Sequence, residues 1–246
     1  MKKIILSIFA TILLGMNSVA YGATELIDIN FFPYGGTYSG TAYEGIVNGE
    51  SGTQTWNNFY EGTMTNQSLN YADGTGDSGV DISYDFTSVD GSYESGFSSG
   101  QYAGLMNGNV YTTNGTTATL SFSGLTANTS YTLYVYTQPN GVTLNGQQLT
   151  VTSNGTTIAT SAAANTSTST FVLGQNVLME TVTSNDKGEI NLTFSGSGIP
   201  DARATVNGIQ LQEAVPEPAS VALLGVGGAF LFGFRKLNSK EESAVA

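Results

Sequence analysis

The stretch YTLYVY, at residues 131–136, places Tyr131, Leu133 and Val135 on one side of an extended chain. The stretch INLTF, at residues 190–194, repeats this pattern with an apolar residue at every second position. Successive side chains of a β-strand point to opposite faces of the sheet, so a period of two indicates a strand with one buried face. Both stretches therefore predict half-buried strands packed on a hydrophobic core.

Similar short runs, each bounded by Gly, Asn, Asp or Pro, extend this interpretation along the chain. They are Leu26–Phe32, Thr55–Tyr60, Val80–Phe86, Ala118–Phe122, Gln148–Thr152, Thr156–Thr160, Ser169–Leu178 and Ala204–Leu211, and the 190–194 run begins at Glu189. Asn-Gly pairs supply the positive-φ turns that tight hairpins need, at 114–115, 140–141, 145–146, 154–155 and 207–208. No window between residues 23 and 213 shows helical periodicity with caps.

Many short strands without helices predict an all-β fold, an antiparallel two-sheet β-sandwich of jelly-roll-like type, over residues 23–213. A solenoid would need a fixed repeat, and the chain shows only recurring Gly-Thr-Thr and Asn-Gly fragments that its composition explains. The sequence contains no cysteine, so burial and strand pairing must stabilise this domain without disulfides.

The first 22 residues have the features of a secretory signal peptide. Lys2 and Lys3 precede the apolar run Ile4–Met16, and small residues follow at the cleavage region. Signal peptidase is thus an expected partner, and the mature chain should begin near Tyr21 or Ala23. We expect residues 1–22 to be removed and not to belong to the folded domain.

Charge in the exported part is strongly negative. Between Glu25 and Glu217 there are 17 acidic residues against two basic ones, Lys187 and Arg203, which leaves 15 net negative charges. Such a field repels phosphate backbones, so nucleic-acid binding is not expected. It favours solubility or the uptake of cations.

The last 33 residues, 214–246, have a different composition. The motif VPEPAS at 215–220 contains Pro216, Glu217 and Pro218, and an apolar stretch without charges follows it. We expect a single transmembrane helix at 219–234, short for a bilayer but adequate with local thinning. The basic end at 235–240, which begins with Arg235 and Lys236, should stay on the cytoplasmic side.

This order of elements resembles the PEP-CTERM sorting signal of Gram-negative bacteria. The resemblance implies recognition by an exosortase, tail removal near Pro216–Pro218, and delivery from the inner membrane to the cell surface or extracellular polymer. The chain continues past the basic end to Ala246, whereas these tails usually stop sooner. An ordinary single-pass anchor with a proline-containing hinge is the alternative. Three short stretches upstream of the tail resemble ectodomains that are often joined to it and have no assigned activity. They are Trp56-Asn57, Leu125–Tyr136 and Val206–Leu211.

Two parts of the predicted domain are candidate binding sites. Trp56 with Asn57 could stack on a sugar ring and hydrogen-bond its hydroxyls, although a lone tryptophan in a strand is more often buried. The carboxylates of Asp73, Asp77 and Asp81 in a Gly-rich loop could hold calcium. Their spacing does not match an EF-hand, so a solvated turn leading into the strand at Val80 is the favoured interpretation.

Catalysis is not expected. The sequence has no histidine, the side chain most used for proton transfer near neutral pH, and no aromatic-flanked acid pair that would indicate a glycosidase. We therefore predict an exported, non-catalytic cell-surface or extracellular-matrix protein, of the kind found in biofilms, with exopolysaccharide as an expected partner and no cofactor. A lectin-like carbohydrate-binding module, with calcium as an optional ligand, is the alternative.

Overall fold

The computed structural model describes residues 25–31, 45–47, 54–90, 103–113, 115–139, 144–165 and 169–214. The predicted signal peptide and the tail from residue 215 onward lie outside these ranges. The described chain is mostly β-strand, with one four-residue helix, α2 (Ala103–Met106).

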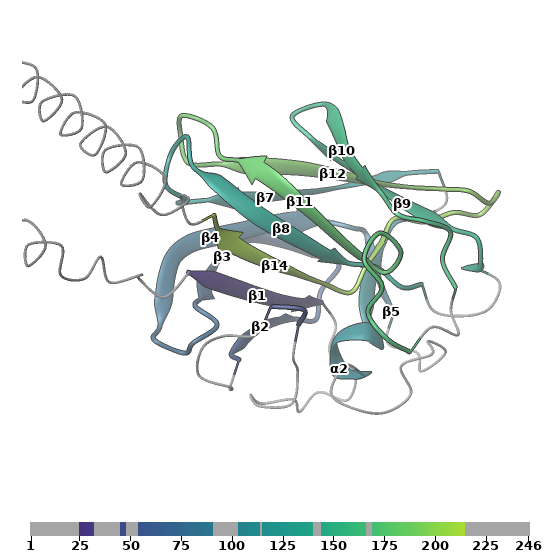
Figure 1. The fold of residues 1–246 in the computed structure, drawn as a ribbon, viewed down its shortest axis with the longest axis horizontal. Helices are drawn as coiled ribbons and strands as arrows, with labels where there is room; N and C mark the ends of the chain where they lie inside the picture. Colours follow the sequence, from purple (N-terminus) through teal and green to yellow (C-terminus); the bar gives the residue numbers. More distant parts are fainter. Residues whose placement is uncertain are drawn as a thin grey trace, which may run out of the picture. The chain divides into compact units, whose positions relative to one another are not determined.

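Two large sheets make up the body. The first has the order β11 (Val177–Thr183), β8 (Ser130–Tyr136), β14 (Gly208–Glu213), β1 (Leu26–Phe31) and β2 (Trp56–Phe59). Figure 1 shows these strands stacked in this order, from β11 to β2. The second sheet has the order β10 (Thr156–Thr160), β9 (Gln148–Ser153), β12 (Ile190–Ser197), β7 (Thr117–Ser123), β4 (Asp77–Asp85) and β3 (Thr63–Asn70).

A third, smaller sheet joins β13 (Thr205–Val206), β6 (Asn109–Tyr111) and β5 (Ser88–Asp90). After β7 the chain alternates between the large sheets, from β7 to β8 to β9 and from β10 to β11 to β12. This alternation places consecutive strands in opposite layers of a sandwich.

The inner faces of the two large sheets share one hydrophobic core. Alternate residues of β8 and β12 enter it, and Val135, Leu192 and Phe194 are each at most 2% exposed. The same alternation brings Ile29 of β1 and Phe122 of β7 into this core, both fully buried. The prediction of a β-sandwich is therefore confirmed.

The pairing of β1 with β2 differs from the expected all-antiparallel sheets. These two strands pair in parallel, with Asp28 opposite Trp56 and Phe31 opposite Phe59. Residues 32–55 connect them, and a connection of this length lets the chain return to the same end of the sheet. The small third sheet was also not predicted.

Two further predictions of local structure are wrong. The strand expected at Ser169–Leu178 begins only at Val177, because Asn176 closes a turn: its side chain accepts from Val172 N (2.7 Å) and donates to Thr170 O (2.9 Å). Asn207-Gly208 forms no hairpin. Asn207 is fully buried between β13 and β14 and donates to Met106 O (2.9 Å) and Gly108 O (2.8 Å). By contrast, Asn154-Gly155, with φ of 50° and 78°, makes the predicted tight turn between β9 and β10.

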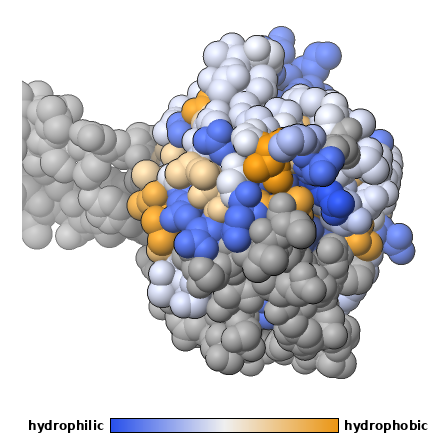
Figure 2. Space-filling model, turned by 90° about the vertical axis from the view of Figure 1, so that its right-hand side faces the viewer, coloured by the Kyte–Doolittle hydropathy of each residue, from blue (hydrophilic) through white to orange (hydrophobic). Residues whose placement is uncertain are grey.

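Large exposed hydrophobic side chains are scattered over the described surface. Leu173 is 55% exposed and Met179 50%, followed by Tyr60, Val172 and Ile46 at 37–45%. On the face that Figure 2 shows, hydrophobic residues form small groups among polar ones. Scattered residues of this kind are ordinary for a solvated protein surface.

Candidate functional site

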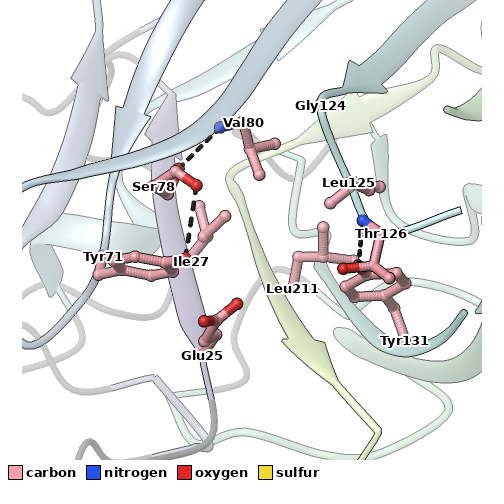
Figure 3. A pocket seen from close by; sticks show the side chains of 10 residues that line it. All are labelled: Glu25, Ile27, Tyr71, Ser78, Val80, Gly124, Leu125, Thr126, Tyr131 and Leu211. Atoms are coloured by element: carbon pink, nitrogen blue, oxygen red, sulfur yellow. Dashed lines mark hydrogen bonds between the residues drawn. The ribbon is translucent and has the colours of Figure 1, made fainter. Parts of the chain in front are cut away.

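A small cavity opens where the two large sheets meet near the start of β1; we call it the end cavity. It has a volume of about 160 Å³. Its lining comes from both sheets and their loops: Glu25, Ile27, Tyr71, Ser78, Val80, Gly124, Leu125, Thr126, Tyr131 and Leu211. Figure 3 shows Tyr71 and Tyr131 on opposite sides of this cavity, with Glu25 close to Tyr71.

Local hydrogen bonds hold the polar side chains of the end cavity. The Tyr131 hydroxyl accepts from Thr126 N (3.0 Å), and the Tyr71 hydroxyl donates to Ser78 O (3.4 Å). The Ser78 hydroxyl donates to Leu69 O (2.7 Å). Gly124 is required at the edge of the cavity, because its φ is +83° and a Cβ there would lie 2.1 Å from Gly79 O.

The end cavity has an acidic character. Burial raises the pKa of Tyr71, and the Glu25 carboxylate raises it further. Burial also raises the pKa of Tyr131; the hydrogen bond from Thr126 opposes this shift, and Glu213 and Glu25 add to it. Both phenols therefore stay protonated at neutral pH, and the Tyr71 hydroxyl already donates its proton to Ser78 O. Two aromatic rings, two hydroxyls and a carboxylate are suited to a sugar residue or another small polar ligand.

A second hollow, of about 450 Å³, lies on the six-stranded sheet over β3, β4, β7 and β12. Cross-strand pairing places Ser83, Ser121 and Asn191 in one row across this sheet and Asp85, Thr119 and Thr193 in the next. The β-bulge between Met64 and Gln67 forms one side of the hollow. It offers hydroxyl and amide groups, whereas Tyr84, which also lines it, is only 3% exposed and belongs to the core.

The predicted glycan contact at Trp56 and Asn57 needs correction. Trp56 is only 6% exposed and packs with Leu105, Met106 and Tyr136 on the outer side of the five-stranded sheet. Asn57 is 9% exposed and ties neighbouring strands together, because it donates to Asp28 O and Asn70 O (both 2.9 Å). The exposed stacking surface that the prediction required is absent from this position.

The structure does not bring the three aspartates of the predicted calcium site together. Asp73 and Asp77 accept from nearby atoms of their own loop, Thr75 N and Gly79 N (both 2.9 Å). Asp81 accepts from the Ser68 hydroxyl across the β3–β4 pair (2.9 Å). Within the described ranges, no group of three or more His, Cys, Asp or Glu side chains could hold a metal ion. The hydrogen bonds of Asp73 and Asp77 are those of a turn and that of Asp81 joins two paired strands, so the predicted three-carboxylate arrangement is wrong.

Sequence reasoning missed a buried polar network on the outer face of the five-stranded sheet. Asp28 is fully buried, and its Oδ1 accepts from Gln210 Nε2 (2.8 Å). Gln210 Nε2 also donates to Val47 O (2.9 Å), and Gln210 Oε1 accepts from Val47 N (3.2 Å). The Tyr136 hydroxyl accepts from Ile46 N (2.7 Å) and donates to Gln210 Oε1 (2.5 Å). The network thus attaches the 45–47 segment to β8 and β14.

Burial raises the pKa of Asp28 to about 7, although the hydrogen bond from Gln210 lowers it in part. Among the described residues, no basic side chain contributes to this shift. The alternation in β1 did place Asp28 and Asn30 away from the core, but it could not show that other segments cover this face of the sheet.

The predicted sorting residues Pro216, Glu217 and Pro218, the flanking Arg235 and Lys236, and the transmembrane helix at 219–234 all lie outside the described residues. In the part of the chain that the structure describes, no helix is long and apolar enough to cross a membrane. The helix at 219–234 stays a prediction.

Comparison with known proteins identifies the tail. The model of the PEP-CTERM protein-sorting motif matches residues 214–236, so the chain carries this motif at its C-terminal end. The prediction made from the Pro-Glu-Pro sequence, the apolar stretch and the basic end is confirmed. No curated protein sequence matches the chain.

Several solved structures are similar to the body at low identity. The complex of the plant peptide RALF23 with FER and LLG2 contains a chain that is 16% identical, with 79% of this chain and 41% of that chain covered and a TM-score of 0.45. The ANX2 ectodomain from Arabidopsis thaliana is 12% identical, with 77% of this chain and 51% of that chain covered and a TM-score of 0.48. A family 35 carbohydrate binding module from an environmental isolate is 17% identical, with 53% of this chain and 93% of that chain covered and a TM-score of 0.35.

The chain spans about half or less of the first of these structures. At sequence identities of 12–17% and TM-scores below 0.5, the similarity supports no conclusion about function. What the fold and the motif together define is a β-sandwich protein with a PEP-CTERM sorting tail.

Proposed function

We propose that this chain is an exported, non-catalytic protein of the cell surface or extracellular matrix, which an exosortase sorts through its C-terminal tail. The PEP-CTERM motif at residues 214–236 is the observation that carries this proposal. The chain passes through the inner membrane transiently and is separated from its tail near Pro216–Pro218.

The chemistry of the sequence supports a structural or adhesive role for the body. The whole sequence has neither histidine nor cysteine, so it lacks the side chain most used as a general base near neutral pH and the thiol nucleophile. Hydroxyl and amide groups on the six-stranded sheet could contact exopolysaccharide along an open surface. Weak contacts repeated along a polymer suit an adhesive protein better than a closed catalytic pocket would.

Mass spectrometry of the mature protein's C-terminus tests the sorting proposal. In the native host we expect a new end near Pro216–Pro218, and replacing Pro216, Glu217 and Pro218 with Ala should leave the full tail in place. Glu242→Ala, beyond the basic end, is the matched control and should be processed as the wild type is. A wild-type protein that still ends at Ala246 would contradict the proposal and favour a plain membrane anchor.

The alternative function is a carbohydrate-binding module, and the end cavity is the observation that favours it. Its volume of about 160 Å³ suits a single sugar residue, and it combines two tyrosine side chains with the Glu25 carboxylate. This location replaces the one expected at Trp56 and Asn57.

Saturable binding on a glycan array, followed by calorimetry, tests this alternative. If it holds, Tyr71→Ala together with Glu25→Gln should weaken binding of the selected glycan at least about tenfold, the effect of losing about 1.4 kcal/mol. Tyr60→Ala changes a tyrosine that is 45% exposed and does not line the cavity, and it should bind as the wild type does. Failure to bind any glycan saturably would leave only the structural role.

A further inference from the structure

The end cavity lies beside two carboxylates that are neighbours across paired strands. Glu213 N donates to Glu25 O (3.3 Å), which continues the antiparallel pairing of β14 with β1 by one residue. Glu25 is two positions before Ile27 and Glu213 two after Leu211, so both carboxylates lie on the core side of the five-stranded sheet, at its end. Like charges directly opposite each other on paired strands are destabilising.

Both carboxylates also act on the two phenols of the end cavity. Tyr131 is opposite Glu213 in the β8–β14 pair, and Figure 3 shows Glu25 close to Tyr71. Burial raises the pKa of Tyr71 and of Tyr131, and Glu25 and Glu213 each raise both pKa values further. The negative field of the two carboxylates therefore reaches both sides of the cavity.

No basic side chain of the described chain balances these two charges. Lys187 and Arg203 are the only basic residues between Glu25 and Glu217, and neither contributes to the pKa of the two phenols. Arg203 lies instead over the Tyr111 ring, 4.9 Å from its centroid. A ligand that carries its own positive charge would relieve the repulsion between the two carboxylates.

The rest of the lining determines what kind of cation fits. The cavity walls include four aliphatic side chains, those of Ile27, Val80, Leu125 and Leu211. Such walls offer nothing to a hydrated metal ion, but they pack against the body of an organic cation. The rings of Tyr71 and Tyr131 on opposite sides can pack against a sugar ring, and aromatic faces also attract a cation.

We propose that the end cavity binds a sugar residue that carries a protonated primary amine, as in a polysaccharide of glucosamine units without N-acetyl groups. Its ammonium group donates to the carboxylates of Glu25 and Glu213, and its ring lies between Tyr71 and Tyr131. Charge-assisted hydrogen bonds of this kind are about twice as strong as neutral ones. The inference rests on the carbohydrate-binding role proposed for this cavity and names the class of sugar.

Calorimetry with the full chain in mild detergent, at pH 6 and about 0.15 M salt, tests the proposal with two sugars of equal length. They are a tetramer of glucosamine and a tetramer of N-acetylglucosamine, which keeps the sugar ring but has no charge. We expect the glucosamine tetramer to bind at least about tenfold more tightly, because it makes hydrogen bonds between charged groups. Tetralysine, a cation without a sugar ring, should bind more weakly than the glucosamine tetramer.

Two variants locate the site. Glu25→Gln together with Glu213→Gln should abolish the preference for the glucosamine tetramer. This variant removes a pair of like charges, so its unfolding midpoint should be no lower than that of the wild type. Glu61→Gln is the matched control and should keep the preference, because this exposed carboxylate follows β2 at the opposite end of the five-stranded sheet.

The outcomes separate this inference from the carbohydrate-binding role. Equal affinity for the two tetramers, or a preference that persists in the double variant, would overturn the inference and leave that role intact. No saturable binding of either tetramer would overturn both. Loss of the preference in Glu61→Gln, or binding of tetralysine as tight as that of the glucosamine tetramer, would show attraction to the overall negative charge and would also overturn the inference.

Discussion

Asp28→Asn should be more stable than the wild type at pH 8 by about 4 kcal/mol and nearly equal to it at pH 4. Burial raises the pKa of Asp28 from 3.8 to about 7. Each unit of difference between the folded and unfolded pKa corresponds to about 1.4 kcal/mol. Asparagine has nearly the same shape but never ionises, so it avoids this cost.

The direction of this pH dependence follows from the number of protons that the folded and unfolded states bind. Between pH 4 and 7 the unfolded chain has lost the Asp28 proton while the folded chain still holds it, so the folded state binds more protons. Stability from this group is therefore present at low pH and is lost as the pH rises through 7. The polar groups that face Asp28 from the described segments are uncharged, namely the Gln210 amide and, through Gln210, the Tyr136 hydroxyl and Val47 backbone.

Urea unfolding at a series of pH values gives the difference between the two proteins directly. Asp77→Asn is the matched control, since the same substitution at an exposed carboxylate should leave the pH dependence of the wild type unchanged. Wild-type and Asp28→Asn curves that run parallel from pH 4 to 8 would show that Asp28 ionises normally in the folded protein.

The strands at the centre of the sandwich could be predicted because their signal is local. Tyr131, Leu133 and Val135 alternate with less apolar neighbours and are all at most 5% exposed. β3 was missed for the same reason, because only Leu69 of its eight residues is buried and no alternation marks it.

The candidate sites were harder to predict because they depend on contacts between distant segments. Trp56 is covered by Leu105 and Met106, about fifty residues further along the chain. Asp28 meets Gln210 across the β1–β14 pair. A period of two shows which side chains share a face, but it cannot show that a loop covers that face.

The sorting motif in the tail, by contrast, could be predicted because its residues are contiguous in the sequence. Pro216, Glu217 and Pro218 form a contiguous motif with the apolar stretch and the basic end after them. Such a signal needs no fold to be recognised, and the family comparison confirms it at residues 214–236. This difference explains why the sorting motif could be predicted from the sequence, whereas the residues that line the cavities could not.

Phe86→Ala should lower the free energy of unfolding by about 3–5 kcal/mol, the cost of removing a buried aromatic ring and leaving a cavity. Phe86 follows β4, is fully buried, and lies 5.4 Å from the Phe194 ring of β12 and 6.0 Å from the Phe31 ring of β1. It therefore connects the six-stranded sheet to the five-stranded one.

Met179→Ala, at a side chain that is 50% exposed, should change stability by less than about 0.5 kcal/mol. Urea unfolding measures both, and a loss below about 1 kcal/mol for Phe86→Ala would mean that the two sheets do not share a close-packed core at this ring.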